Sequence, residues 1–377
     1  MIMQWKKYVC MLSLVALVAC QAETPHSPET SIQVGDALSG ESIGFEQALA
    51  PREFRFPEDH GPHEKFATEW WYFTGNVATA EGRRFGYQLT FFRVGLDANP
   101  VARFSHWSSS QIYMAHFALT DVDGKTFHPF ERFARAVPQL AGAQAQPLRV
   151  WLEDWSVEGA SDATLPLHLR AQQDSFAIDV TLDSSKPIVL QGDKGLSQKS
   201  SAAGNASYYY SMTRMATQGA ITIGDRKFAV TGQSWFDREW STSALAESQA
   251  GWDWFSLQLD DQTELMFYQL RNKDGTTDLL SSGTLVNAQG VVRRLAAKDV
   301  LLTPLDFWQS DSSNIRYPVQ WRIFVPDSGL DLTVTPLLEN QEMALSVRYW
   351  EGAVIVSGKK HGQPINGRGY LELAGYK

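Results

Sequence analysis

Apolar and polar residues alternate along most of the chain after about residue 51, with the period of half-buried β-strands. Segments 70–77 and 83–94 are rich in aromatic and β-branched residues and flank a turn containing Gly82, so they predict a β-hairpin. Similar short segments follow at regular spacing, with polar turns between them: 111–121, 148–158, 165–171, 176–183, 208–217, 219–223, 227–233, 252–260, 264–271, 281–287, 291–295, 317–325, 330–336, 344–358 and 365–373. Only 130–136 and 243–248 predict short helices. The pattern therefore predicts an all-β fold of two tandem lipocalin-like antiparallel β-barrels. Each would have about eight strands and hold one small ligand in its mouth or interior.

The first residues predict export and lipidation. Lys6 and Lys7 precede an apolar run, 9–18, that is too short to span a bilayer comfortably. Leu17-Val18-Ala19-Cys20 then matches a lipobox, in which Cys20 becomes the lipidated first residue of the mature chain. The alternative is an ordinary secretory signal followed by a chance cysteine, but the order of the three regions favours a lipoprotein. Because Gln21 resembles the outer-membrane sorting pattern, we expect a lipid-anchored envelope protein that faces the periplasm.

The composition predicts four segments along the chain and excludes some classes of binding partner. We predict a signal peptide over 1–19, a flexible tether rich in Ser, Thr, Pro, Gly and Glu over 20–50, and barrel domains over 51–242 and 243–377. Cys10 would leave with the signal and the Cys20 sulfur would carry lipid, so we expect no disulfide, no zinc site made of cysteines and no thiol nucleophile. We also expect no other metal and no cofactor. The net charge of −9 and the lack of a basic run argue against nucleic acid as a partner. Thirteen Trp, twelve Tyr and twenty Phe offer stacking surfaces for a hydrophobic small molecule or lipid.

The first candidate site lies at the start of the predicted hairpin. Strand alternation places Trp70 and Tyr72 on one face and Glu69 on the other, together with large aromatic residues. A carboxyl in such surroundings has a raised pKa and can act as an acid. The alternative is that Glu69 has only a structural role, in which an arginine or a backbone amide binds its carboxylate. His60 and His63 just upstream are only weak evidence for a metal site.

Two further motifs stand close together, Gly232–Ser241 and Gly251–Phe255. In the first, Asp237 and Glu239 share one strand face and Trp240 lies on the opposite face. Repulsion between two acids so close raises the pKa of one of them. A buried network of an arginine and carboxylates would explain the presence of the two acids equally well. In the second motif, Trp252 and Trp254 share a face, as expected of a ligand wall or of a purely structural aromatic layer.

Three isolated residues complete the candidates. Arg93 and His116 are possible ligand contacts, but His116 lies on the apolar face of a strand, where a satisfied core histidine is more common. Ser234 lacks the Gly-x-Ser-x-Gly context of a serine-hydrolase nucleophile.

These motifs resemble the AttH/CrtC family, which includes carotenoid 1,2-hydratases and predicted secreted hydrolases. The resemblance is carried by 56–76, 111–121, 232–241, 251–271, 281–286, 349–354 and 367–376, and so covers most of the chain. It implies tandem lipocalin-like barrels and an apolar pocket for isoprenoid or other lipidic molecules. It also implies acid-catalysed hydration of an alkene, with Asp237 or Glu239 as the acid and Trp240, Trp252 and Trp254 as the wall. The hydratases have a histidine where this chain has Arg238, so this chain resembles the secreted AttH branch more closely.

Three functions follow from these predictions. The first is an enzyme, a hydratase or hydrolase or a related isomerase or cyclase, with acid catalysis by Asp237, Glu239 or Glu69. The second is a non-catalytic lipid carrier, an accessory lipoprotein of an ABC-type export system with its permease. The third is a structural or adhesive lipoprotein. Lipocalin-like barrels host both carriers and catalysts, so the fold alone does not choose among them.

Overall fold

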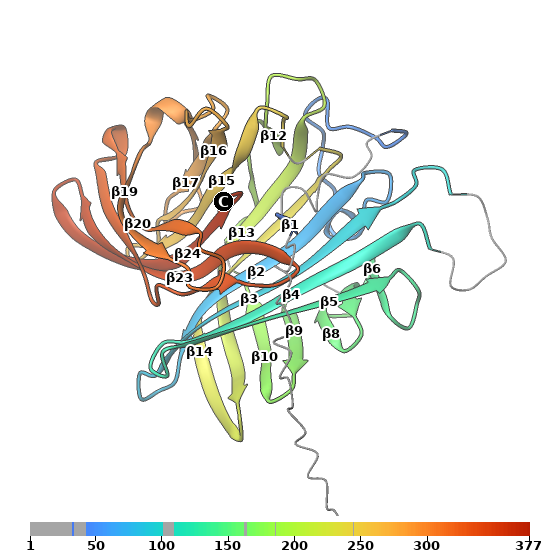
Figure 1. Cartoon of the computed structure of the whole chain (residues 1–377), viewed down its shortest axis with the longest axis horizontal. Coiled ribbons are helices and arrows are strands. Elements are labelled where there is room, and N and C mark those ends of the chain that lie inside the picture. Colours follow the sequence, from blue (N-terminus) through green and yellow to red (C-terminus); the bar gives the residue numbers. More distant parts are fainter. Residues whose placement is uncertain (1–31, 34–42, 101–108, 162–163, 185, 244) are drawn as a thin grey trace, which may run out of the picture. The chain divides into compact units, whose positions relative to one another are not determined.

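The structure is a computed structural model that describes residues 32–33, 43–100, 109–161, 164–184, 186–243 and 245–377 (Figure 1). The predicted signal peptide and Cys20 lie outside these residues. Nearly all regular structure in the described part is β-strand, arranged in two antiparallel sheets, so the predicted fold class is confirmed. None of the helices among the described residues is long and apolar enough to cross a membrane.

The first sheet is built from residues 68–241. The predicted hairpin is formed by β2 (Thr68–Ala78) and β3 (Arg84–Gly95), and both of its strands have neighbours on each side in the sheet. From one edge to the other the order is β5 (Thr126–Arg135), β4 (Gln111–Asp121), β3, β2, β14 (Arg226–Ser241), β13 (Ala206–Ile223), β10 (Phe176–Asp183), β9 (Leu167–Gln173), β8 (Trp155–Glu158), β7 (Leu148–Leu152) and β6 (Ala141–Ala145). Short strands β11 (Val189–Leu190) and β12 (Leu196–Gln198) pair with β13, and the short helix η1 (Glu58–His60) precedes the sheet.

The second sheet is built mainly from residues 249–374. Its order is β18 (Val292–Ala296), β17 (Ser282–Val286), β16 (Glu264–Asn272), β15 (Gln249–Leu259), β24 (Gln363–Ala374), β23 (Val347–Lys360), β21 (Leu330–Pro336), β20 (Arg316–Val325) and β19 (Leu301–Gln309). Strands β22 (Glu342–Met343) and β1 (Ile32–Gln33) also pair with β23, the latter in parallel. The short helices η2 (Ala297–Asp299) and η3 (Pro326–Ser328) lie in connections of this sheet.

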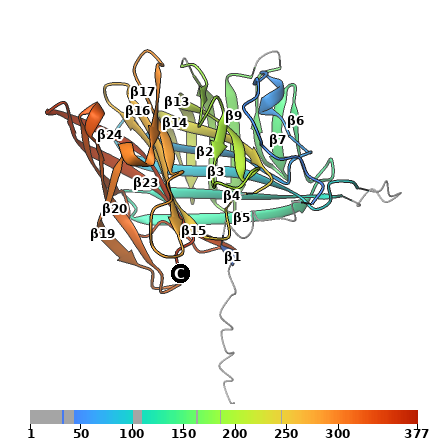
Figure 2. The same cartoon turned by 90° about the horizontal axis from the view of Figure 1, so that it is seen from above.

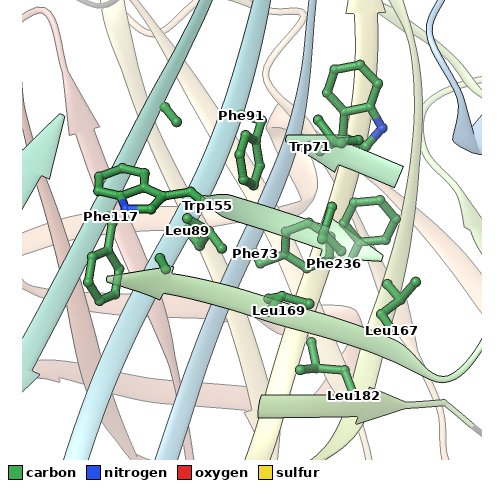
Figure 3. Packing of buried hydrophobic residues seen from close by; sticks show 14 of the residues in the cluster. Trp71, Phe73, Leu89, Phe91, Phe117, Trp155, Leu167, Leu169, Leu182 and Phe236 are labelled. Carbon is green, nitrogen blue, oxygen red and sulfur yellow. The ribbon is translucent and has the colours of Figure 1, made fainter. Parts of the chain in front are cut away.

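Each sheet curls around its own hydrophobic core, and one forms a nearly closed barrel (Figure 1). The core of the first sheet is filled by large side chains from alternate positions of its strands, among them Trp71, Phe73, Phe117, Trp155 and Phe236 (Figure 3). Protein interiors are packed about as densely as organic crystals, so these side chains fill much of the space that the sheet encloses. The pocket described below lies between the two sheets, outside this core.

The local structure differs from the sequence prediction in four places. Residues 130–136, predicted as helical, belong mostly to strand β5, because pairing with β4 supplies a hydrogen-bond ladder that outweighs local propensity. Residues 243–248 contain no helix where the structure describes them, and the edge strand β19 was not predicted. Residues 43–50, expected to be part of the tether, pack on the body, and the Tyr208 hydroxyl donates to the Ala50 carbonyl at 2.9 Å.

The two sheets contact each other through the faces that point away from their cores. The Asn76 side chain donates to the Gly369 carbonyl at 2.9 Å, linking β2 to β24. A Cβ at Gly86 would lie 2.5 Å from that of Ala353, so the missing side chain allows β3 to approach β23. The predicted boundary at 242/243 falls between the last strand of the first sheet, β14, and the first main strand of the second, β15. Both sheets belong to one compact unit, residues 31–377 (Figure 2).

Candidate active site

A pocket lies between the facing surfaces of the two sheets. Its cavity volume is about 90 Å³. Aromatic and aliphatic side chains dominate the lining, and four ionisable groups are set among them. The lining residues are Trp70, Tyr72, Phe92, Lys199, Tyr209, Asp237, Glu239, Ser241, Ser243, Leu245, Trp252, Trp254, Tyr268, Leu270, Tyr349 and Glu372. An apolar pocket with a few convergent polar groups and perturbed carboxyls is the usual form of a ligand or active site.

Strand β14 supplies two carboxyls to the pocket through simple alternation. Asp237 and Glu239 point into the pocket, whereas Arg238 and Trp240 point to the other face, as the sequence pattern predicts. The pairing of β14 with β2 and β13 fixes this orientation, since Asp237 stands opposite Tyr72 on one side and Ser211 on the other.

Asp237 is buried and accepts three hydrogen bonds. The Tyr209 hydroxyl donates to Oδ2 at 2.5 Å, and Ser211 Oγ and Trp235 Nε1 donate to Oδ1 at 2.5 and 2.6 Å. Burial raises the pKa of Asp237 to about 7, with a further contribution from repulsion by Glu239, although the three donors oppose the shift. A large fraction of Asp237 is therefore protonated near neutral pH.

Glu239 is held differently, by an ion pair with Lys199. Lys199 Nζ lies 2.9 Å from Glu239 Oε1 and 4.3 Å from the centre of the Tyr268 ring. Ser207 Oγ also donates to Glu239. Burial alone would lower the pKa of Lys199, but the Glu239 carboxylate raises it, so Lys199 carries its charge. Glu239 thus has Lys199 as its cationic partner, which Asp237 does not contact.

The second sheet contributes another carboxyl, Glu372 on β24. Trp252 Nε1 donates to Glu372 Oε1 at 2.7 Å. Burial raises the pKa of Glu372 to about 7, and Asp237 and Glu239 add repulsion. Behind it, Glu351 on β23 is the register partner of Glu372 and accepts from the Tyr72 hydroxyl at 2.7 Å. Burial and the nearby Glu372 charge hold the pKa of Glu351 well above its ordinary value.

Four predicted aromatic residues meet in this pocket. Trp70 and Tyr72 come from β2 of the first sheet, and Trp252 and Trp254 come from β15 of the second. The Tyr72 and Trp254 rings pack edge to face with centroids 5.1 Å apart. The sequence indicated both pairs, but only the packing of the sheets brings them together.

Glu69, Arg93 and Trp240 lie on the opposite face and do not line the pocket. Arg93 and Arg238 both bind the fully buried Glu69 carboxylate. Burial alone would raise the pKa of Glu69, but these two guanidinium groups hold it well below its usual range. The predicted acid role for Glu69 is therefore corrected to a structural one. Trp240 stacks on the His63 ring at 3.7 Å within the first core, so it is not part of the ligand wall.

His116 lies behind the pocket rather than in it. It is fully buried, and its Nδ1 lies 2.7 Å from the hydroxyl of Tyr349, which lines the pocket. Burial lowers the pKa of His116 to about 3, so the ring is neutral. This geometry matches a core histidine that supports a pocket residue.

The two histidines of the first motif are also engaged by protein groups. His60 Nδ1 lies 2.5 Å from the Tyr210 hydroxyl, and His63 Nε2 lies 3.0 Å from Asp59 Oδ1. No cluster of three or more His, Cys, Asp or Glu suited to a metal ion occurs in the described part of the chain.

Lys199, Tyr209 and Glu372 were missed as site residues in the sequence. Glu372 had a signal, because it interrupts an apolar strand and faces away from Leu371 and Leu373. Tyr209 lies in a run of three tyrosines without any distinguishing spacing. Lys199 lies outside the regular strands, so no periodicity points to its position.

The fold and pocket define a lipocalin-like β-protein with acidic groups in an aromatic site between two sheets. The chain belongs to the AttH-like family, whose profile matches residues 47–376. An AttH-type crystal structure from Nitrosomonas europaea is 36% identical, with a TM-score of 0.76 over 87% of this chain and 100% of that one.

More distant relatives have enzymatic names. Kievitone hydratase from Nectria haematococca shares the fold, with 18% identity and a TM-score of 0.66 over 88% of this chain and 96% of its own. The dehydratase asqC of Emericella nidulans is 22% identical over 229 residues, which are 57% of this chain and 63% of that protein.

Proposed function

We propose that this protein is a hydro-lyase that adds water to, or removes it from, an apolar unsaturated molecule bound between the two sheets. The observation that carries the proposal is Asp237, a buried carboxyl on the pocket wall whose pKa is raised to about 7. A general acid works best when its pKa lies near the operating pH. The names of the two enzymatic relatives, a hydratase and a dehydratase, support the same class of reaction.

The proposed reaction needs a proton donor and nearby aromatic side chains that stabilise a carbocation. The Asp237 carboxyl gives its proton to one carbon of the double bond, and the other carbon becomes cationic. The faces of Trp252 and Trp254 stabilise that charge, as aromatic faces do for other cations. Water then adds to the cation and loses a proton, so that the product gains one water in all. The aromatic lining favours an isoprenoid or another lipidic substrate.

A non-catalytic lipid carrier is the second candidate. The predominantly apolar lining of the pocket supports it, since hydrophobic residues suit retention of a lipid as well as its conversion. In that case the protein serves as the periplasmic partner of an ABC-type permease, as expected from the sequence.

We also propose that Cys20 tethers the protein to the outer membrane. Metabolic labelling with radioactive palmitate tests this directly. The wild-type chain should take up label, and Cys20→Ala should not and should leave the membrane fraction. Label retained in Cys20→Ala contradicts the tether.

One experiment separates the two functional candidates. The full chain, solubilised in mild detergent, is incubated with an apolar extract of its host's envelope in water enriched in heavy oxygen. High-resolution mass spectrometry should find a lipid species that gains one labelled water with the wild type. Asp237→Asn should form it at least about 100-fold more slowly.

The control is Asp331→Asn, which changes an exposed carboxylate that pairs with Arg322 and is not part of the pocket lining. It should match the wild type. Equal rates in Asp237→Asn and wild type contradict the proposed acid. A lipid that copurifies with the protein and remains unchanged favours the carrier.

A further inference from the structure

A hydration also needs a group that accepts the proton lost by water, and the acid on β14 leaves that role unassigned. We propose that Glu372 positions and deprotonates the water, so that the acid and the base of one reaction stand on different sheets. This inference rests on the proposed function and extends it. It makes the space between the sheets, rather than either barrel, the complete catalytic unit.

The orientation of Glu372 follows from its strand register. On β24 it stands opposite Trp254 of β15 on one side and Glu351 of β23 on the other. Side chains opposite each other in neighbouring strands share a face, so all three point toward the first sheet. Trp252 holds Glu372 Oε1 at 2.7 Å, and the side chain is half-buried at the pocket wall. Glu372 therefore faces the same space as Asp237 from the opposite sheet.

Glu351 determines which carboxyl of the second sheet can ionise. Two neighbouring carboxyls in a buried site do not both ionise readily near neutral pH. Glu351 is fully buried and does not line the pocket, whereas Glu372 reaches it. The proton accordingly stays on Glu351, whose pKa is held well above its ordinary value. Glu372 is left as the carboxyl that gains and loses a proton.

The charged and titratable groups around Glu372 come from five strands and one loop. They are Glu351 and Tyr349 on β23, Asp237 and Glu239 on β14, Tyr72 on β2, Tyr209 on β13, Tyr268 on β16, and Lys199 in the loop after β12. Lys199 pairs with Glu239, so Asp237 and Glu372 are the carboxyls of the pocket lining that have no cationic partner among the described residues. The form active in hydration holds one proton between these two groups, on Asp237.

The proton balance of the reaction is then closed. Asp237 gives its proton to one alkene carbon and becomes a carboxylate. The oxygen of the water molecule then bonds to the cationic carbon, and the Glu372 carboxylate takes a proton from that water. The product has gained one hydrogen and one hydroxyl. The proton now on Glu372 returns to Asp237 through solvent. No oxidant or other co-reactant is needed.

The test compares the pH dependence of hydration in the wild type, Glu372→Gln and Asp237→Asn, using the lipid species that the wild type hydrates in the extract. The wild type should show a bell-shaped profile. Glu372→Gln should be at least about 100-fold slower and should lose the acidic limb, because no carboxylate remains to be generated as pH rises. Asp237→Asn should lose the alkaline limb instead.

The matched control is Glu342→Gln, which changes a different glutamate of the second sheet, one that is buried. Glu342 is held by Ser310, Ser312 and Ser313 and does not line the pocket. It should keep the wild-type profile.

The outcomes separate the two proposals. If Asp237→Asn is inactive but Glu372→Gln keeps the wild-type rate and acidic limb, Glu372 is not the base and the proposed function stands. If the wild type hydrates no lipid, both proposals fail.

A second readout, independent of turnover, is nuclear magnetic resonance of isotope-labelled glutamate carboxyls. A carboxyl that titrates near neutral pH should be missing in Glu372→Gln, and its presence there would assign that titration to another residue and overturn the inference.

Discussion

The hydroxyl of Tyr72 donates to Glu351 Oε1 at 2.7 Å, which joins a central strand of the first sheet to one of the second through a buried hydrogen bond. Tyr72→Phe removes the donor and leaves the carboxyl without this partner. We expect the free energy of unfolding to fall by about 1–3 kcal/mol. Urea unfolding measures this change.

The same contact also tests whether Glu351 is neutral. Glu351→Gln keeps an acceptor for Tyr72 and resembles the protonated acid, so it should change the free energy of unfolding by less than about 1 kcal/mol. A loss in Glu351→Gln larger than that in Tyr72→Phe would show that an ionised carboxylate occupies this position.

Asp237 should make the free energy of unfolding decrease as pH rises. Its pKa is about 7 in the folded protein, against about 4 in an unfolded chain, so folding takes up a proton between these values. Stability should therefore fall as pH rises from about 4 through about 7. Asp237→Asn should remove part of this fall, as measured by urea unfolding at several pH values. An identical pH slope in wild type and variant would contradict the raised pKa.

Glu69 should matter more for stability than any exposed ion pair. Glu69→Gln leaves the buried Arg93 and Arg238 without their carboxylate, which should cost about 3–5 kcal/mol. Glu46→Gln, which breaks the exposed pair with Lys65, should stay within about 1 kcal/mol of the wild type. Thermal or urea unfolding of both variants decides the matter. Similar losses in the two would mean that the Glu69 network is not a buried ion cluster.

His116 should remain neutral well below the usual histidine pKa. Its folded pKa is about 3, against about 6.5 unfolded, so its contribution to stability is present above the unfolded value and is lost as pH falls toward the folded one. Nitrogen chemical shifts of the imidazole should show no protonation at about pH 5. Titration near the ordinary value would mean that the ring reaches solvent or a carboxylate.

The sequence by itself determined much of the local structure. Alternation correctly placed Asp237 and Glu239 on one face of a strand and Trp252 and Trp254 on one face of another. The same rule predicted the central hairpin, because a strand with one buried face must repeat with period two. It failed at 130–136, where pairing with β4 rather than local propensity makes the strand.

Only the tertiary structure decided which of these faces meet. Glu69 and Asp237 were both candidate acids in the sequence, yet one faces two arginines inside a core and the other faces a pocket. Glu372 and Lys199 join the site from distant parts of the chain because the outer faces of two sheets pack together. A carboxyl's protonation state depends on burial and on charges a few ångströms away, and those neighbours come from strands that are remote in sequence.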